Sequence, residues 1–142
     1  MEISYKYYTL ELILRLFCGV IFLFQGYDKL FKVKISGVID AFRFEAQQKN
    51  IPSFALSLMA YYTSYCEFIG GLLLIVGLFK NYALLALGLD MVLVAAAFSY
   101  MKPVWDMKFV FPRLILIILL MGMPGRWSVF SLDFVIRNFL LR

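Results

Sequence analysis

Four charged residues lie inside long apolar stretches of this chain, where an ionised side chain is costly. They are Arg15, Glu67, Asp90 and Arg113. A charge in the hydrocarbon core of a membrane costs about 2.5–3.5 kcal/mol on insertion scales, so it usually faces protein or water and has a partner. Two acids and two bases therefore predict a buried polar network, whose chemistry would be ion pairing, proton handling or the binding of a polar ligand group.

We expect each base to pair with one acid. Arg15 would pair with Glu67, because arginine reaches several ångströms along a helix axis and can bind a carboxylate through two hydrogen bonds. Arg113 would then pair with Asp90, and the swapped pairs are the alternative. Such pairs can simply fix the register of the helices, or they can handle protons or bind a ligand. The sequence leaves these two roles open.

The apolar stretches that carry these charges predict four membrane-spanning helices. They cover about residues 10–31, 54–79, 82–101 and 109–123. A spanning helix needs about 20 apolar residues, so the last stretch is short. The chain is 63% hydrophobic and 16% charged, against about 45–50% and 25% in soluble domains. We therefore expect an all-α integral membrane four-helix bundle, formed by residues 1–142 as one transmembrane domain with both termini on one side.

The first two stretches each carry polar and small residues on one helix face. In the first stretch these residues are Glu11, Arg15, Cys18, Gly19, Phe22, Gln25, Gly26 and Lys29. Such a face marks the side of a membrane helix that packs against protein, since lipid cannot satisfy polar groups. Small residues around Glu67 in the second stretch allow a neighbouring backbone to come close. The candidate ligand-binding or packing face comprises Gln25, Gly26, Lys29, Gly70 and Gly71.

Two further segments have the composition of helices that lie at a membrane interface. Residues 37–48, in the long loop after the first stretch, alternate apolar and charged side chains and predict an interfacial or re-entrant helix. Residues 131–142 predict a C-terminal amphipathic helix for the same reason. Cations are nearly balanced between the two sides, so the sequence does not fix the orientation in the membrane.

The residue types that are missing exclude several kinds of redox centre. The chain has no histidine, which excludes His-ligated haem, His-based zinc sites and His proton relays. Cys18 and Cys66 form no CxxC motif, and both are expected to be small buried side chains. Neither a flavin fingerprint nor iron–sulfur spacing is present. We therefore expect no metal site, and the sequence assigns no catalytic residue.

The net charge of +5 also has a simple explanation in a membrane protein. Lys29, Lys32, Lys34 and Lys49 flank the apolar stretches, where cations meet anionic lipid headgroups. The expected partners are the lipid bilayer and other membrane protein subunits, and not nucleic acid.

Six segments, in collinear order, resemble the DoxX family of small bacterial and archaeal membrane proteins. They are RLFCGVIFLFQGYDKLF (15–31), NIP (50–52), EFIGGLLLIVGLF (67–79), ALLALGLDM (83–91), FPRL (111–114) and MPGRWSVFSLD (123–133). The resemblance implies a four-helix bundle in the bacterial cytoplasmic (inner) membrane. The family takes its name from a subunit of a terminal quinol oxidase system, and its members are linked to thiosulfate:quinone oxidoreduction and to membrane-bound oxidative-stress complexes. Family members often carry histidine where Gln25 stands.

The resemblance implies an accessory subunit of a membrane redox complex, with a quinone or a lipid as the ligand between its helices. Independent catalysis is not expected, because the sequence encodes no group that carries electrons. Two alternatives remain open. One is a structural or assembly subunit of another membrane complex, and the other is a small-solute or proton pathway that uses Glu67 and Asp90.

Overall fold

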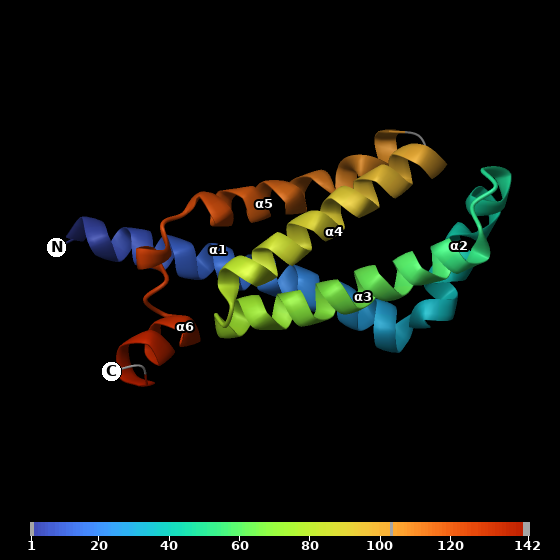
Figure 1. Cartoon of the computed structure of the whole chain (residues 1–142). Coiled ribbons are helices and arrows are strands. Elements are labelled where there is room, and N and C mark those ends of the chain that lie inside the picture. Colours follow the sequence, from blue (N-terminus) through green and yellow to red (C-terminus); the bar gives the residue numbers. More distant parts are fainter. Residues whose placement is uncertain (1, 103, 141–142) are drawn as a thin grey trace.

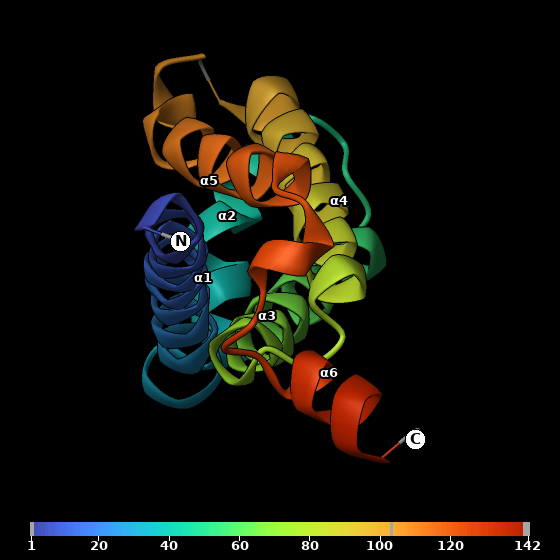
Figure 2. The ribbon, with the colours of Figure 1, turned by 90° about the vertical axis from the view of Figure 1, so that its left-hand side faces the viewer.

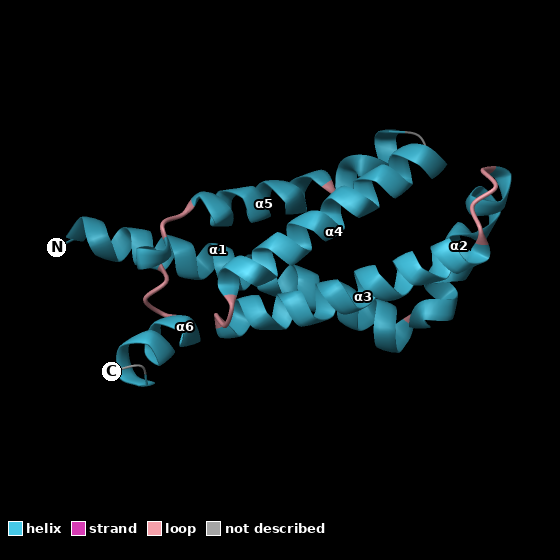
Figure 3. Ribbon diagram, in the orientation of Figure 1, coloured by secondary structure: helices cyan, strands magenta, loops and turns pink. Residues whose placement is uncertain are grey.

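The chain folds into antiparallel helices in the computed structural model, which describes residues 2–102 and 104–140 and the side chains of residues 5–102 and 107–139. Helices and short loops account for all of the described backbone, without a strand (Figure 3). The all-α prediction is therefore confirmed.

Four helices run back and forth along a common axis (Figure 1). They are α1 (Glu2–Tyr27), α3 (Ser53–Val76), α4 (Lys80–Met101) and α5 (Phe111–Gly122). Both termini lie at one end of this bundle, the end that faces the viewer in Figure 2. The segment Tyr5–Lys32 and helices α3 and α4 are long and apolar enough to cross a membrane. The protein is therefore an all-α membrane protein.

Helix α5 is shorter than the expected span of residues 109–123. It has 12 residues, which is about 18 Å at 1.5 Å per residue, against about 30 Å of hydrocarbon. A 3₁₀ turn, η2 (Val104–Phe109), precedes it. Pro112 lies in the first turn of α5, where its missing N–H costs no hydrogen bond. Proline thus starts this helix and does not bend a longer one.

The loop between α1 and α3 contains the short helix that the sequence predicts. A π-helical turn, η1 (Asp28–Lys32), continues α1 and leads into α2 (Lys34–Gln48). Helix α2 lies at the end of the bundle opposite the termini (Figure 1). It begins earlier than the expected residue 37 and ends at the expected residue 48.

The chain after α5 forms short turns at the end of the bundle that holds the termini. These are η3 (Gly125–Trp127), α6 (Leu132–Val135) and the π-helical turn η4 (Ile136–Leu140). The C-terminal helix expected over residues 131–142 is therefore present as two consecutive short segments within residues 132–140, and residues 141–142 lie outside the described residues. The side chain of Ser131 accepts a hydrogen bond from the backbone N–H of Phe134 and caps α6.

Helices α1 and α3 pack closely because glycines remove the side chains between them. A Cβ at Gly26 would overlap the backbone of Phe68, and a Cβ at Gly71 would overlap the backbone of Leu23. This contact fixes the antiparallel register, with Gly26 beside Phe68. The expected buried face of α1 is confirmed for Glu11, Arg15, Cys18, Gly19, Phe22 and Gly26, which are all buried. The other two residues of that face, Gln25 and Lys29, are half-buried.

Candidate functional site

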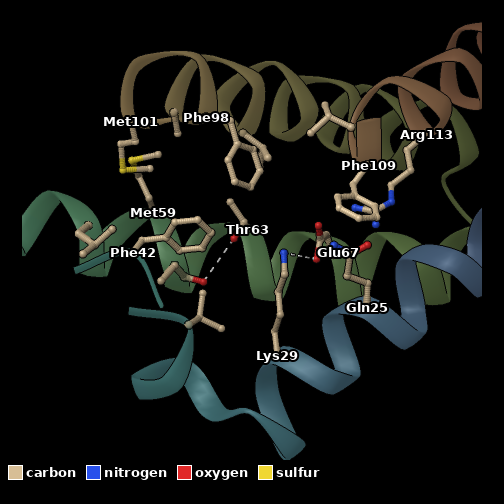
Figure 4. Close-up of a pocket in the computed structure, with 16 residues that line it drawn as sticks. Gln25, Lys29, Phe42, Met59, Thr63, Glu67, Phe98, Met101, Phe109 and Arg113 are labelled. Atoms are coloured by element: carbon tan, nitrogen blue, oxygen red, sulfur yellow. Dashed lines mark hydrogen bonds and ion pairs between the residues drawn. The ribbon is translucent and has the colours of Figure 1, made fainter. Parts of the chain in front are cut away.

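A cavity of about 280 Å³ lies among helices α1, α2, α3, α4 and α5 and the turn η1 (Figure 4). One part of its wall is apolar and is formed by Val38, Phe42, Leu56, Met59, Phe98 and Met101. The opposite part is formed by Gln25, Lys29, Glu67 and Arg113, whose side chains converge from three sides (Figure 4). The cavity therefore has an apolar end near α2 and a charged end toward the middle of the bundle.

The charged end is built around an ion pair between η1 and α3. Lys29 Nζ lies 2.6 Å from Glu67 Oε2, and the Glu67 side chain is 1% exposed. Glu67 is buried among small residues of its own helix, including Gly70 and Gly71. Such a short pair offsets much of the cost of burying the Glu67 carboxylate.

Two other side chains at this end are not fully used by the protein. Arg113 reaches the cavity from α5 and forms no ion pair with any residue of the described chain. Gln25 Oε1 is buried and accepts no hydrogen bond from the described residues. A guanidinium donor and an amide acceptor are therefore both available to a polar group that enters the cavity.

The expected Arg15–Glu67 pair is wrong, because the two residues lie at different levels of the bundle. Gly26 packs beside Phe68, which places the preceding residue, Glu67, near the end of the antiparallel α1. Arg15 precedes Gly26 by 11 residues, about 16 Å along the helix at 1.5 Å per residue. Lys29, one turn beyond Gly26, takes the place that was assigned to Arg15.

Arg15 instead belongs to a second buried cluster, formed by Glu11, Arg15, Lys80, Ser128 and the backbone segments around them. Its guanidinium donates to the carbonyl oxygens of Leu74 (2.7 Å) and Ile75 (3.1 Å), at the end of α3, and to that of Phe130. Carbonyls in the last turn of a helix lack the regular partner four residues further along, so a buried arginine is a suitable additional donor to Leu74 and Ile75.

Glu11 and Lys80 complete this second cluster. Lys80 Nζ lies 2.9 Å from Glu11 Oε1 and donates to Ser128 Oγ at 2.7 Å, while Ser128 Oγ also donates to Glu11. Asp133 accepts hydrogen bonds from the backbone N–H groups of Phe79, just before α4, and of Lys80, its first residue. Because the protein supplies these partners, the cluster joins α1, α3, α4 and the C-terminal segment as a structural clamp.

The expected Arg113–Asp90 pair is also not formed by the residues that the structure describes. Asp90 is fully buried in α4, and neither of its carboxylate oxygens has a hydrogen-bond partner among the residues that the structure describes. A Cβ at Gly70 would touch Leu87, so these two residues lie at the same level of the antiparallel helices α3 and α4. Glu67 precedes Gly70 by three residues and Asp90 follows Leu87 by three, so these two acids also lie at the same level. The two acids therefore face each other across α3 and α4, behind the charged end of the cavity.

Helix α2 and the end of α4 contact each other beside the apolar end of the cavity. The rings of Phe42 and Phe98 meet edge to face, with centroids 5.5 Å apart. Lys102 Nζ lies 3.3 Å from Glu45 Oε1 and 5.0 Å from the centre of the Phe42 ring. This contact, the α2–α4 latch, joins two elements that are otherwise separated by the cavity.

The expected ligand or packing face divides into two groups of residues with different roles. Gln25 and Lys29 line the cavity. Gly26 and Gly71 hold α1 against α3, and Gly70 holds α3 against α4. Sequence reasoning missed Lys80 and Ser128, which lie at the first position of α4 and in a loop, where charged and polar residues are normally exposed.

The DoxX family model matches residues 10–101 of the chain. This range includes Gln25, Lys29, Glu67 and Asp90. No curated protein and no solved structure matches the chain.

Proposed function

Because the chain belongs to the DoxX family, we propose that it is an accessory subunit of a membrane redox complex and holds a quinone-type ligand between its helices. The observation that carries this proposal is the cavity, which combines an apolar wall with a small charged end. Ligand sites are mostly apolar pockets with a few converging polar groups, and this cavity has that composition. A quinone has the matching shape, with oxygen atoms on a ring and an apolar chain.

The residues of the charged end fit the oxygen atoms of such a ring. The Arg113 guanidinium and the Lys29 ammonium are hydrogen-bond donors, and quinone carbonyl oxygens are acceptors. Phe42, Met59 and Phe98 would contact the ring or the chain, with methionine adapting to an irregular shape. In this proposal the subunit binds and positions the quinone, and a partner subunit supplies the electrons.

We propose that this subunit works in the bacterial cytoplasmic membrane as a multi-pass protein. The three apolar helices and the family membership support that location. The sequence encodes no recognisable electron carrier, which favours a role beside another membrane protein over independent catalysis.

Purification of the tagged chain from its own membranes in mild detergent tests the accessory role. We expect an oxidoreductase to co-purify, and we expect deletion of the gene to lower quinone-linked respiration or tolerance to oxidants. Quinone turnover by the purified chain without partners would contradict the accessory role. Unchanged respiration and unchanged oxidant tolerance after deletion would contradict the redox role and favour a structural or assembly function in another complex.

A proton pathway is the second candidate function, and Asp90 is the observation that favours it. Its carboxyl group is fully buried and has no hydrogen-bond partner in the described part of the chain, and such a group is costly and often functional in a membrane protein. Purified chain in vesicles with an internal pH indicator tests this candidate. Proton flux that Asp90→Asn abolishes would support it, and vesicles as tight as protein-free ones would contradict it.

A further inference from the structure

We propose that the cavity binds the reduced, hydroxyl-bearing form of its ligand in preference to the oxidised form, as a neutral hydroquinone head on an apolar chain. This inference rests on the proposed function and specifies the ligand of the same cavity. It follows from the hydrogen-bonding groups at the charged end, from their charge balance and from the position of that end in the bundle.

The hydrogen-bonding groups at the charged end include an acceptor that needs a donor. Gln25 Oε1 is buried and has no donor among the described residues. A buried acceptor without a partner costs free energy, and a ligand that supplies the donor recovers it. A quinone oxygen can only accept hydrogen bonds, whereas a hydroquinone hydroxyl both donates and accepts. A hydroquinone can therefore donate to Gln25 while it accepts from Arg113 or Lys29.

The charge balance around the cavity favours a neutral head group. Lys29 and Arg113 line the charged end together with Glu67, and Asp90 lies behind it. With two basic and two acidic groups, the formal charge of this region is zero. The carboxylate of a fatty acid would add an unbalanced negative charge beside the buried Glu67 and Asp90, which is costly. The neutral hydroquinone avoids this cost.

The position of the charged end argues against a phospholipid. Glu67 and Asp90 lie near the middle of α3 and α4, so the charged end lies inside the bundle. The apolar end lies near α2, at the end of the bundle opposite the termini (Figure 4). A phospholipid keeps its large headgroup at the membrane surface, and its headgroup would therefore meet the apolar end. A hydroquinone head is small and uncharged, so it can pass to the inner end with its chain behind it.

Anaerobic titration of the purified full-length chain with decylubiquinol and with decylubiquinone tests this preference. We expect the quinol to bind about tenfold more tightly, because one unpaired buried acceptor has an effect of that order. Gln25→Leu should remove this difference by weakening quinol binding while quinone binding stays. The matched control is Gln47→Leu, which changes an exposed glutamine on α2 and should keep the preference.

Each other outcome contradicts a specific step. Equal binding of quinol and quinone by the natural chain would overturn the preference and leave the proposed function in place. A preference that survives Gln25→Leu would overturn the role of Gln25. If myristate, used as an anionic probe, bound more tightly than the quinol, the argument from charge would be overturned. Binding of neither quinone form would overturn both this inference and the quinone-binding role, whereas the deletion experiment tests the redox role separately.

Discussion

Removing the Lys29 ammonium should destabilise the bundle more than removing the charges of Lys29 and Glu67 together. The pair is short, with Lys29 Nζ 2.6 Å from Glu67 Oε2, and the carboxylate is almost completely buried. Lys29→Met would leave that carboxylate without its cation, whereas the double variant Lys29→Met/Glu67→Gln leaves no charge there. The order of stabilities therefore reports on whether the two side chains form a pair.

The size of the effect follows from the burial of the two partners. Loss of one partner from a buried ion pair costs about 3–5 kcal/mol, because the other charge remains unpaired. The Lys29 side chain is 21% exposed, so we expect the lower end of this range, about 3 kcal/mol, for Lys29→Met. The double variant should lose about 1 kcal/mol, which gives a coupling free energy of about 2 kcal/mol or more.

Thermal unfolding in mild detergent, followed with a thiol-reactive dye, measures these differences. Cys18 is buried and Cys66 is partly buried, so both become reactive when the bundle opens. Arg15→Met combined with Glu67→Gln is the matched control, and its effects should add, because Arg15 belongs to the other cluster. Simple addition for Lys29 and Glu67, with coupling between Arg15 and Glu67, would refute the register described above.

Three further changes test the packing, the helix end and the latch. Gly71→Ala should lower stability by about 1–3 kcal/mol in the same unfolding assay, because its Cβ would overlap the α1 backbone. The control Gly122→Ala has open space around the new Cβ and should have little effect. Equal losses of stability in the two variants would contradict the close contact between α1 and α3. Asp133→Ala should cost about 1 kcal/mol through loss of the cap on α4, and an unchanged unfolding temperature would contradict that role. Glu45 has a backbone hydrogen bond and Lys102 nearby, which lower its pKa. The α2–α4 latch should therefore be complete above the ordinary pKa of about 4.3 and weaken as the pH falls through the lowered value. The distance between spin labels on α2 and α4 should be longer in acid, and a distance that does not change with pH would contradict the latch.

The sequence was sufficient to predict the helices and their buried faces. Periodic small and polar residues such as Cys18, Gly19 and Gly26 mark the face of a helix that packs against protein. The pattern within one helix is enough for this prediction, and the identity of the neighbouring helix is not needed. The short helix in the first loop follows in the same way from the local pattern. Helix α5 was predicted too long, because hydropathy continues through Phe109 and Val110 although Pro112 starts the α-helix.

The pairing of the charges could not be predicted from the sequence, because it depends on the register between two helices. The contacts of Gly26 and Gly71 determine which residue of α1 faces Glu67, and about four helical turns separate Arg15 from Lys29. The cavity is likewise a product of packing, since it forms where α2 and α4 meet through a few side chains. Gln25 and Lys29 could be identified from the sequence as candidate site residues, because they are polar residues on the packed face.

The amount of quinone that stays bound to the purified protein tests the central proposal most directly. Ala97 lines the cavity, and Ala97→Phe would fill part of it, whereas Ala96→Phe places the same side chain at the exposed neighbouring position. We expect solvent extracts of the natural chain and of Ala96→Phe to contain bound quinone, and extracts of Ala97→Phe to contain much less. Equal amounts in all three proteins, or none in the natural chain, would contradict quinone binding in this cavity.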